Sequence, residues 1–445
     1  MTGANRGQIL ADVLKDKIKL RLARVAVIGL GYVGLPLAVQ KAKIGFDVLG
    51  IDQNPKRVDL VNQGKSYIND VAEEVLQEVI CANKLQATES FHQLGECDIV
   101  IICVPTPLTP TRDPDISYIE RVTLEVSKYL HRGQLVTLES TTYPGTTEEV
   151  VLPLLERSGL EVGKDYFLAY SPERVDPGNK RYNTQNTSKI VGGVTSLCLE
   201  VACTFYAQTI QQVVPVSSPS VAEMTKIFEN TYRAVNIALV NELMFLCDRM
   251  GIDVWEVVEA AATKPFGIQT FYPGPGVGGH CIPVDPFYLT WKARQYDFST
   301  RFIELAGQIN IQATYYVVEK VRKVLNLMEK SVNGARILVL GVTYKKDVPD
   351  IRESPALKIM KLLQEERAEL RYHDPYIPEV ELPGTGILRS VPLEADQLAW
   401  ADCVVIITDH TIIDYQFVVD HARIVVDTRN ATRQVTLNRD RIVKI

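Results

Sequence analysis

One cysteine of the sequence follows a run of glycines and precedes an aspartate, in the segment GPGVGGHCIPVD at residues 274–285. Glycines can adopt positive φ angles and leave backbone N–H groups free to point at a ligand. In this setting the Cys281 thiol could act as a nucleophile, and Asp285 could position a water or a base. The alternative is a buried structural cysteine beside a tight turn, because most cysteines are small core residues.

A second group of chemically capable residues lies on one long helix that the sequence predicts over residues 220–250. Lys226 and Asn230 share one face of it, in a stretch otherwise rich in apolar residues. Since unpaired polar groups are costly to bury, the pair could point into a cleft between two domains. The alternative is a solvated stripe on a partly exposed helix. Ser220 with Glu223 predicts a capping box at the helix start.

An earlier glycine-rich segment has the surroundings of a dinucleotide site. An expected strand at 24–28 enters GLGYVG, a helix-like stretch follows to about residue 44, and a second strand at 47–51 ends at Asp52. In such a unit the first glycine makes the turn, the second admits a pyrophosphate and the third packs the helix on the strand. The terminal acidic residue binds the ribose hydroxyls and repels a 2′-phosphate, so we expect NAD. The alternative is a glycine turn in another kind of α/β unit. The three glycines are Gly29, Gly31 and Gly34.

Later apolar runs each end in Pro, Thr, Ser or Gly. They are residues 98–104, 135–138, 167–170 and 189–191, and the first three lead into VPTP, ESTTYPGT and SPERVDPGN. Open α/β sheets bind ligands at the carboxyl ends of their strands. Thr106, Thr141 and Glu173 are therefore candidate site residues, and local capping or turn formation is the alternative for each.

Residues 333–445 again alternate expected strands and helices, but they contain no GxGxxG turn. We expect strands at 336–340, 369–372, 403–407 and 423–426, and a helix that Ser354 caps and Pro355 begins. Four cations stand at expected strand ends, an arrangement that suits a phosphorylated ligand. They are Lys345, Lys346, Arg352 and Arg429.

Composition sets the class of protein. The chain has 445 residues, 46% hydrophobic and 23% charged, with a formal net charge of -6. These values are those of a soluble globular protein of two or three domains without general affinity for nucleic acid or anionic membranes. No apolar run reaches the roughly 18 residues of a membrane span, and no signal peptide opens the chain. Eight scattered cysteines and six histidines predict a cytoplasmic protein with reduced thiols and no metal site.

Seven motifs, in order, resemble the UDP-glucose/GDP-mannose dehydrogenase family along the chain after residue 22. They are GLGYVGLPLA, VPTP, ESTTYPGT, SPERVDPGN, EMTKIFENTYRAVNIALVNE, GPGVGGHCIPVDP and LGVTYKKDVPDIRESPA. The chain is most similar to the branch that oxidises N-acetylated hexosamines, in particular UDP-N-acetylglucosamine 6-dehydrogenases. In the UDP-glucose branch a second glutamate usually stands where this sequence has Pro177. That departure argues against UDP-glucose, and Arg174 could read the acetamido group.

The resemblance implies a role for each candidate residue. Catalysis would use Cys281 as the nucleophile, Lys226, Asn230 and Asp285 for protons, water and the oxyanion, and Thr141 and Glu173 for hydrolysis. NAD would be held by Gly29, Gly31, Tyr32, Val33, Gly34, Asp52, Arg57, Pro105, Thr106, Thr142 and, from the C-terminal domain, Arg352. The UDP-sugar would contact Arg174, Lys226, Asn230, Gly278, Lys345, Lys346 and Arg429. For His280 we expect either a structural role or a role in supporting the residues that contact the substrate.

We therefore expect an α/β protein with two Rossmann-like doubly wound domains joined by a long central helix. The expected parts are an N-terminal helix (1–22), an NAD domain (23–215), a helical middle domain (216–330) and a UDP-sugar domain (331–445). The expected reaction is a four-electron oxidation at C6 of a UDP-N-acetylhexosamine, for surface polysaccharide or lipopolysaccharide, by a homodimer or larger homo-oligomer. The alternatives are a two-electron dehydrogenase of the 6-phosphogluconate or hydroxyisobutyrate kind and a non-catalytic NAD-sensing protein.

Overall fold

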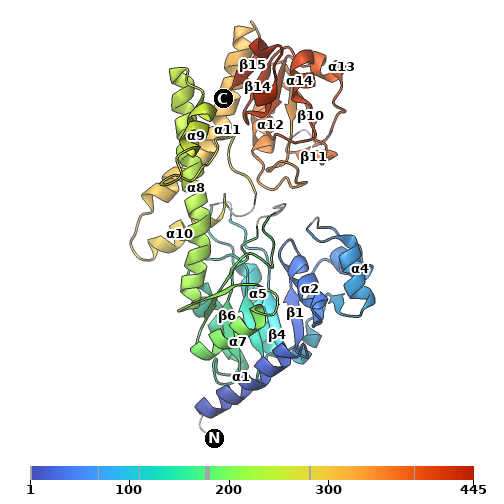
Figure 1. Ribbon diagram of the computed structural model, residues 1–445, viewed down its shortest axis with the longest axis vertical. Coiled ribbons are helices and arrows are strands. Elements are labelled where there is room, and N and C mark those ends of the chain that lie inside the picture. Colours follow the sequence, from blue (N-terminus) through green and yellow to red (C-terminus); the bar gives the residue numbers. More distant parts are fainter. Residues whose placement is uncertain (1–2, 69, 110, 176–180, 280–281, 385) are drawn as a thin grey trace. The chain divides into compact units, whose positions relative to one another are not determined.

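The computed structural model describes residues 3–68, 70–109, 111–175, 181–279, 282–384 and 386–445. The chain forms two compact units (Figure 1). The first contains Met1–Glu229 and Trp291–Asp297, and the second contains Asn230–Thr290 and Phe298–Ile445. In the described part of the chain, no helix combines the length and the apolar character needed to cross a membrane.

The first unit is built on an eight-stranded sheet in the order β3-β2-β1-β4-β5-β6-β7-β8. All neighbouring strands are parallel except β6 and β7, which are antiparallel. The strands are β1 (Arg24–Ile28), β2 (Asp47–Ile51), β3 (Leu85–Thr88), β4 (Ile99–Ile102), β5 (Leu135–Leu138), β6 (Phe167–Tyr170), β7 (Lys189–Gly193) and β8 (Val213–Val216). The expected strands at 24–28, 47–51, 135–138 and 167–170 have these bounds.

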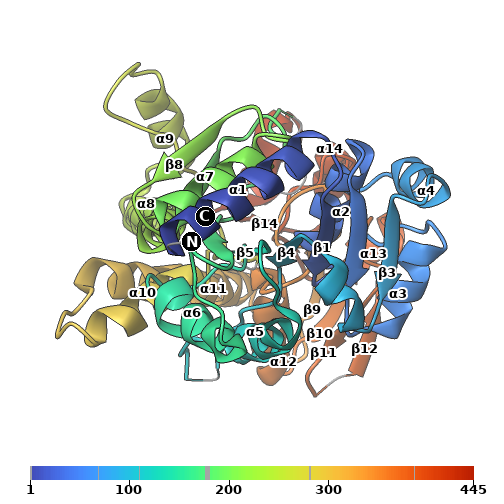
Figure 2. The ribbon, with the colours of Figure 1, turned by 90° about the horizontal axis from the view of Figure 1, so that it is seen from below.

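Helices cover both faces of this sheet, because its strands are continuous apolar runs that need burial on each side. One buried cluster joins the sheet to α1, α2, α4 and α7, and a second joins it to α5 and α6. Figure 2 shows α1 beside α7. The helices are α1 (Gly3–Lys19), α2 (Gly34–Lys43), α3 (Pro55–Asn62), α4 (Glu73–Cys81), α5 (Ser117–Tyr129), α6 (Leu152–Leu155) and α7 (Ser196–Tyr206). The expected N-terminal helix is confirmed.

The long helix α8 (Pro219–Met250) begins differently from the prediction. Its start is capped by Ser218, whose Oγ accepts the N–H of Val221 at 3.3 Å. Glu223 instead turns to the segment that leads into α6, where it accepts the backbone N–H groups of Gly145 at 2.6 Å and Thr147 at 2.9 Å. The predicted capping box is therefore wrong, because a tertiary partner outcompetes the local one.

The second unit contains a five-stranded parallel sheet in the order β10-β9-β13-β14-β15 and a separate hairpin of β11 and β12. The strands are β9 (Arg336–Leu340), β10 (Glu369–His373), β11 (Glu379–Leu382), β12 (Gly386–Arg389), β13 (Cys403–Ile406), β14 (Val425–Asp427) and β15 (Ile442–Lys444). The helices beyond α8 are α9 (Val254–Ala262), α10 (Asp285–Arg294), α11 (Arg301–Leu327), α12 (Pro355–Glu365), α13 (Ala395–Trp400) and α14 (Tyr415–His421). The sheet packs on α11 and α12 through one face and on α13 and α14 through the other.

In each unit, a glycine with a positive φ angle begins the turn that follows the first strand of the sheet. Gly29 follows β1 with φ +92°, and a Cβ there would lie 2.4 Å from the carbonyl oxygen of Cys103, just after β4. Gly341 follows β9 with φ +80°, and a Cβ there would lie 2.4 Å from the carbonyl oxygen of Thr408, just after β13. The expected fold class, two Rossmann-like sheets with a helical middle region, is confirmed. The domain boundaries remain predictions.

Candidate active site

The glycine turn after β1 has the geometry that a pyrophosphate needs. Gly31 has no heavy atom within 4 Å of the position of an added Cβ, so its backbone is open to a ligand. Gly34 is closed in, because a Cβ there would lie 1.8 Å from the Gly29 carbonyl oxygen. With Gly29 at positive φ, the three glycines make the turn, the opening and the helix–strand contact that the sequence predicts.

Asp52 stands where the second strand ends, beside that turn. Its carboxylate is 6% exposed, and it accepts the N–H groups of Leu30 and Asn54, each at 2.9 Å. Arg57 Nη1 lies 3.3 Å from the same carboxylate. A carboxylate has about four acceptor positions, so Asp52 retains capacity for ribose hydroxyls. These residues fit NAD.

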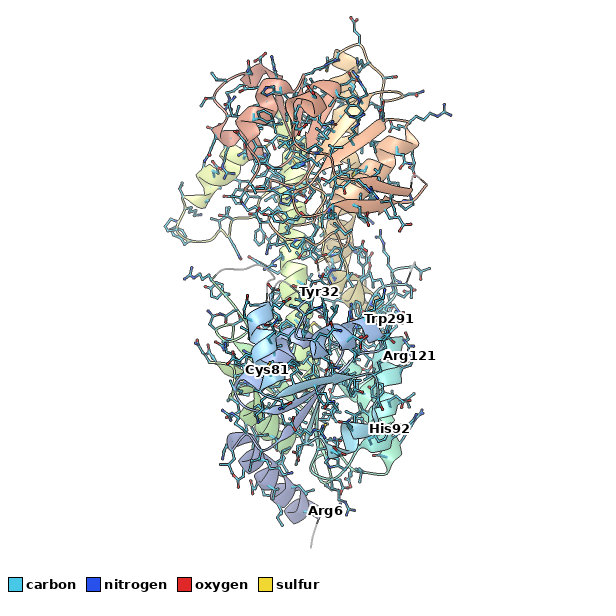
Figure 3. All side chains as sticks on the ribbon, turned by 90° about the vertical axis from the view of Figure 1, so that its right-hand side faces the viewer. Arg6, Tyr32, Cys81, His92, Arg121 and Trp291 are labelled. Carbon is cyan, nitrogen blue, oxygen red and sulfur yellow. The ribbon has the colours of Figure 1, made fainter. Side chains whose placement is uncertain are left out.

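In Figure 3, Tyr32 from the glycine turn and Arg6 from α1 lie at opposite ends of the first unit.

Several other predicted cofactor contacts lie near the carboxyl ends of β4 and β5. Thr106 is buried and Pro105 is exposed. Thr142 is buried and its Oγ1 lies 2.6 Å from that of Thr146, whereas Thr141 is half-buried. Val33 stands at the N-terminus of α2.

Glu173 is the predicted catalytic residue with the most developed surroundings. One carboxylate oxygen accepts the N–H groups of Arg174 at 2.8 Å and Val175 at 2.9 Å. The other lies 3.4 Å from the ammonium group of Lys189, which also pairs with buried Glu139 at 2.6 Å. Burial alone would raise the pKa of Glu173, but the Lys189 charge and the two N–H groups hold it below its usual value.

Sequence reasoning missed Glu139 and Lys189. Each is a charged residue next to a wholly buried strand, Glu139 directly after β5 and Lys189 at the first position of β7. Charges at such positions need partners, and that is the signal by which they could have been found.

Arg174 forms several hydrogen bonds within the first unit. Its guanidinium donates to both carboxylate oxygens of Glu229, at 2.5 and 3.2 Å, and to the carbonyl oxygen of Ser188 at 2.6 Å. Lys226, on α8, is 8% exposed and contributes to the lowered pKa of Glu173. Pro177 lies outside the described residues.

In the second unit, Asn230 and Asp285 are brought together as a pair. Asn230 Nδ2 donates to Asp285 Oδ2 at 2.5 Å, and Asp285 is 1% exposed at the first position of α10. Cys281 and His280 lie outside the described residues.

The glycine-dense segment before Cys281 packs against other parts of the second unit. A Cβ at Gly278 would lie 2.6 Å from the Tyr344 Cβ and 2.8 Å from the Glu353 carbonyl oxygen. The N–H of Gly279 donates to the carbonyl oxygen of Arg352 at 2.9 Å. These glycines therefore permit close contact with the loop after β9, a role that the sequence pattern alone could not separate from ligand approach.

The predicted cations of the second unit cluster around that same loop. Arg352 forms a bidentate pair with Asp350, with Nη2 2.6 Å from Oδ2. Arg429 donates through Nε to the Ile407 carbonyl oxygen at 3.0 Å, and burial lowers its pKa. Lys346 is half-exposed and lies 3.8 Å from Asp409. The carbonyl oxygen of Lys345 accepts the Thr343 hydroxyl at 2.9 Å, which fixes its backbone.

Three domain models of the UDP-glucose/GDP-mannose dehydrogenase family match successive stretches of the chain. The NAD binding domain matches residues 23–210, the central domain 220–312 and the UDP binding domain 338–434. Among curated proteins, a UDP-N-acetyl-D-mannosamine dehydrogenase of Pyrococcus horikoshii is 37% identical over 87% of this chain and 89% of its own. A UDP-N-acetyl-D-glucosamine 6-dehydrogenase of Pseudomonas aeruginosa is 39% identical over 80% of this chain and 83% of its own.

Solved structures show the same likeness. A UDP-D-ManNAc dehydrogenase from Pyrococcus horikoshii superimposes with a TM-score of 0.86 at 33% identity, over 95% of this chain and 98% of that one.

Proposed function

Because the chain belongs to the UDP-glucose/GDP-mannose dehydrogenase family, we propose that it oxidises C6 of a UDP-N-acetylhexosamine to the carboxylate, using NAD. The observation that carries the proposal is the family match across all three domains, which joins an NAD domain to a UDP domain in one chain. The N-acetylhexosamine part is supported by the relatives, which act on N-acetylated glucosamine and mannosamine nucleotides.

Our first choice of sugar is UDP-N-acetylglucosamine, on the strength of the SPERVDPG and GGHCIPVDP motifs. UDP-N-acetylmannosamine is the second candidate, since a relative of that specificity aligns with most of the chain. UDP-N-acetylgalactosamine and UDP-glucose are the remaining alternatives.

Turning the alcohol into a carboxylate removes four electrons, so two NAD molecules are used in succession, each accepting one hydride. We propose that Gly29, Gly31, Gly34 and Asp52 hold the cofactor. A base that includes Asp285, oriented by Asn230, takes the C6 hydroxyl proton in the first oxidation. The Lys226 ammonium stabilises the oxygen that gains negative charge.

The Cys281 thiolate retains the aldehyde by adding to its carbonyl carbon, which forms a thiohemiacetal. Loss of a hydride from that carbon and of the hydroxyl proton leaves a thioester. Water then adds to the acyl carbon, the C–S bond breaks with its electron pair on sulfur, and Glu173 accepts a water proton. Because Glu173 has a lowered pKa, it is a carboxylate near neutral pH and able to take that proton.

The test is the amount of NADH formed per sugar consumed, for UDP-N-acetylglucosamine, its manno and galacto isomers, and UDP-glucose. Two NADH per sugar, fastest with UDP-N-acetylglucosamine, supports both the reaction and the sugar. A faster rate with another isomer would change the assigned sugar and leave the proposed reaction unchanged. One NADH per sugar with aldehyde released, or no NADH with any of the four, overturns the four-electron reaction.

A Cys281→Ser variant adds a second arm to this experiment. It should form no acid yet bind NAD as tightly as the wild type, because the cysteine lies outside the NAD motif. Full acid production by the variant would exclude the thioester route.

A further inference from the structure

In the first unit, three buried polar side chains and the partly exposed Glu173, the proposed hydrolytic residue, form a continuous hydrogen-bonded series. Lys189 Nζ lies 2.6 Å from Glu139 Oε2 and 3.4 Å from Glu173 Oε2. The other oxygen of Glu139 accepts the Tyr206 hydroxyl at 2.7 Å. The Lys189 side chain is 4% exposed and that of Glu139 is 0% exposed, while Glu173 keeps 17%. Of these four side chains, Glu173 is therefore the one that is exposed to solvent.

The sheet topology explains why a residue at the start of a strand reaches a site built on strand ends. β5 and β6 are parallel, so Glu139 and Glu173 follow their strands at the same edge. β7 is antiparallel to β6, so its first residue, Lys189, also lies at that edge. The single reversal in the sheet thus places a cation between two carboxylates.

We propose that Lys189 is a positioning residue for Glu173, holding its carboxylate ionised and oriented for thioester hydrolysis, while Glu139 and Tyr206 hold Lys189. This inference rests on the proposed function. A buried ion pair is weak evidence for stability, because desolvation offsets most of its attraction. The position of Lys189 between a partly exposed carboxylate and a fully buried one is therefore better explained by its effect on Glu173.

Several charged or titratable groups surround Glu173 in the first unit, and their effects differ in sign. Lys189 from β7 and Lys226 from α8 favour its ionised form, as do the N–H groups of Arg174 and Val175. Glu139, after β5, neutralises part of the Lys189 charge. Three further groups lie around the Lys189–Glu139 pair: Lys41 from α2, Tyr206 from α7 and Cys103 after β4.

Removing the Lys189 ammonium would leave Glu139 and Glu173 as two carboxylates without the cation between them. Like charges and burial both favour protonation of a carboxyl group. The pKa of Glu173 should then rise, and the protein should lose hydrolytic base near neutral pH while NAD binding is unchanged.

The test compares Lys189→Met with Lys189→Arg and Lys292→Met in the full-length protein with UDP-N-acetylglucosamine and excess NAD. Lys292 is a matched control, a lysine of the same unit that is 6% exposed and pairs with Glu149 at 2.6 Å. For Lys189→Met we expect a rapid burst of NADH, then turnover slowed at least tenfold at pH 7 and recovered as the pH rises. Lys189→Arg should restore much of the rate, and Lys292→Met should keep the wild-type pH profile.

A second variant and a second measurement make the outcome decisive. If Lys189→Met does not fold, Lys189→Met with Glu139→Gln removes the unpaired buried carboxylate and still lacks the cation beside Glu173. Titration of the Glu173 carboxyl by carbon-13 NMR, assigned with Glu173→Gln, reports its ionisation without any turnover. An unchanged pH profile and an unchanged Glu173 titration in the variant that folds would overturn the inference. A wild-type protein that makes no NADH overturns the proposed function instead, and the NMR titration still reports whether Lys189 keeps Glu173 ionised.

Discussion

Asn230 holds Asp285 in place: its side-chain amide donates to the Asp285 carboxylate at 2.5 Å and thereby joins α8 to the first residue of α10. Asp285 is almost completely buried. A buried carboxylate that loses a donor carries a desolvation cost, so the orientation of Asp285 depends on this amide.

We therefore expect Asn230→Ala to lower kcat about tenfold or more, with NAD affinity changed less than about twofold. Asn236→Ala is the matched control, because Asn236 is on the same helix and its amide donates to the Tyr232 carbonyl oxygen of that helix. Stopped-flow turnover and calorimetric NAD binding measure the two quantities. Equal kcat values for the two variants would contradict the assigned role.

Gly31 and Gly34 should respond oppositely to alanine. At Gly31 an added Cβ meets no atom of the protein, so Gly31→Ala should keep the thermal stability and lose NAD affinity by about tenfold or more. At Gly34 an added Cβ would overlap the Gly29 carbonyl oxygen, so Gly34→Ala should lower the melting temperature. Thermal denaturation without ligand, beside NAD titration, separates the two effects. A destabilised Gly31→Ala variant would show that the turn is closed.

Lys41 makes the stability of the first unit depend on pH. The lysine is fully buried, its Nζ lies 3.9 Å from the centroid of the Phe205 ring, and burial lowers its pKa to about 7 from 10.5. Between these values the unfolded chain binds more protons, so the free energy of unfolding should rise with pH across this window and be flat below it. Lys41→Met should remove that slope and stabilise the protein at neutral pH, by up to about 5 kcal/mol.

Urea denaturation at several pH values measures this effect, with Lys43→Met, an exposed position on the same helix, as the control. A slope that persists in Lys41→Met would assign the pH dependence to other groups.

Asp347 anchors the loop that carries Lys345 and Lys346. It has φ +59°, and its carboxylate accepts the N–H of Thr411 at 2.9 Å and the Thr411 hydroxyl at 2.5 Å. Asn tolerates this φ, so Asp347→Asn changes the hydrogen bonding without adding backbone strain. We expect UDP affinity to fall about fivefold, since the half-exposed Lys346 would lose its fixed backbone.

Isothermal titration with UDP measures this change, and NAD titration should be unaffected. Asp420→Asn, at a half-buried position on α14 in the same unit, is the control. An identical UDP affinity for the wild type and Asp347→Asn would show that this anchor does not position the ligand.

The sequence predicted the sheets well because parallel strands buried on both faces are uninterrupted apolar runs. β1, β2, β5, β6 and β9 have the expected bounds, and Ser354 caps α12 as expected. The second long helix, α11, was missed, and the capping residue of α8 was assigned to the wrong position. The cap depends on the tertiary contact of Glu223, which local patterns do not contain, whereas the buried residues of α11 recur at helical spacing and could have been recognised.

Some features of the candidate site could likewise be predicted from the sequence, and others could not. The hydrogen bond between Asn230 and Asp285 was not predicted, because it joins residues that are 55 positions apart in the sequence. The three glycines and Asp52 follow from a motif whose spacing reflects one local geometry. The Glu139–Lys189 pair does not, because it depends on strand order and on the reversal between β6 and β7. The ion pair of Arg174 with Glu229 on α8 could not be predicted either, because it joins two distant segments, and a substrate contact of Arg174 stays a prediction.

The reversal at β7 also affects how this protein could be re-engineered. Since β6 ends and β7 begins at one edge of the sheet, Ser171 and Ser188, which flank the connecting segment, lie at that same edge. A segment with both ends fixed side by side can be exchanged as a cassette while the strand ladders stay intact. Transplanting residues 171–188 between relatives of different sugar preference would exchange the segment that carries Glu173 and Arg174 and leave the strands in place.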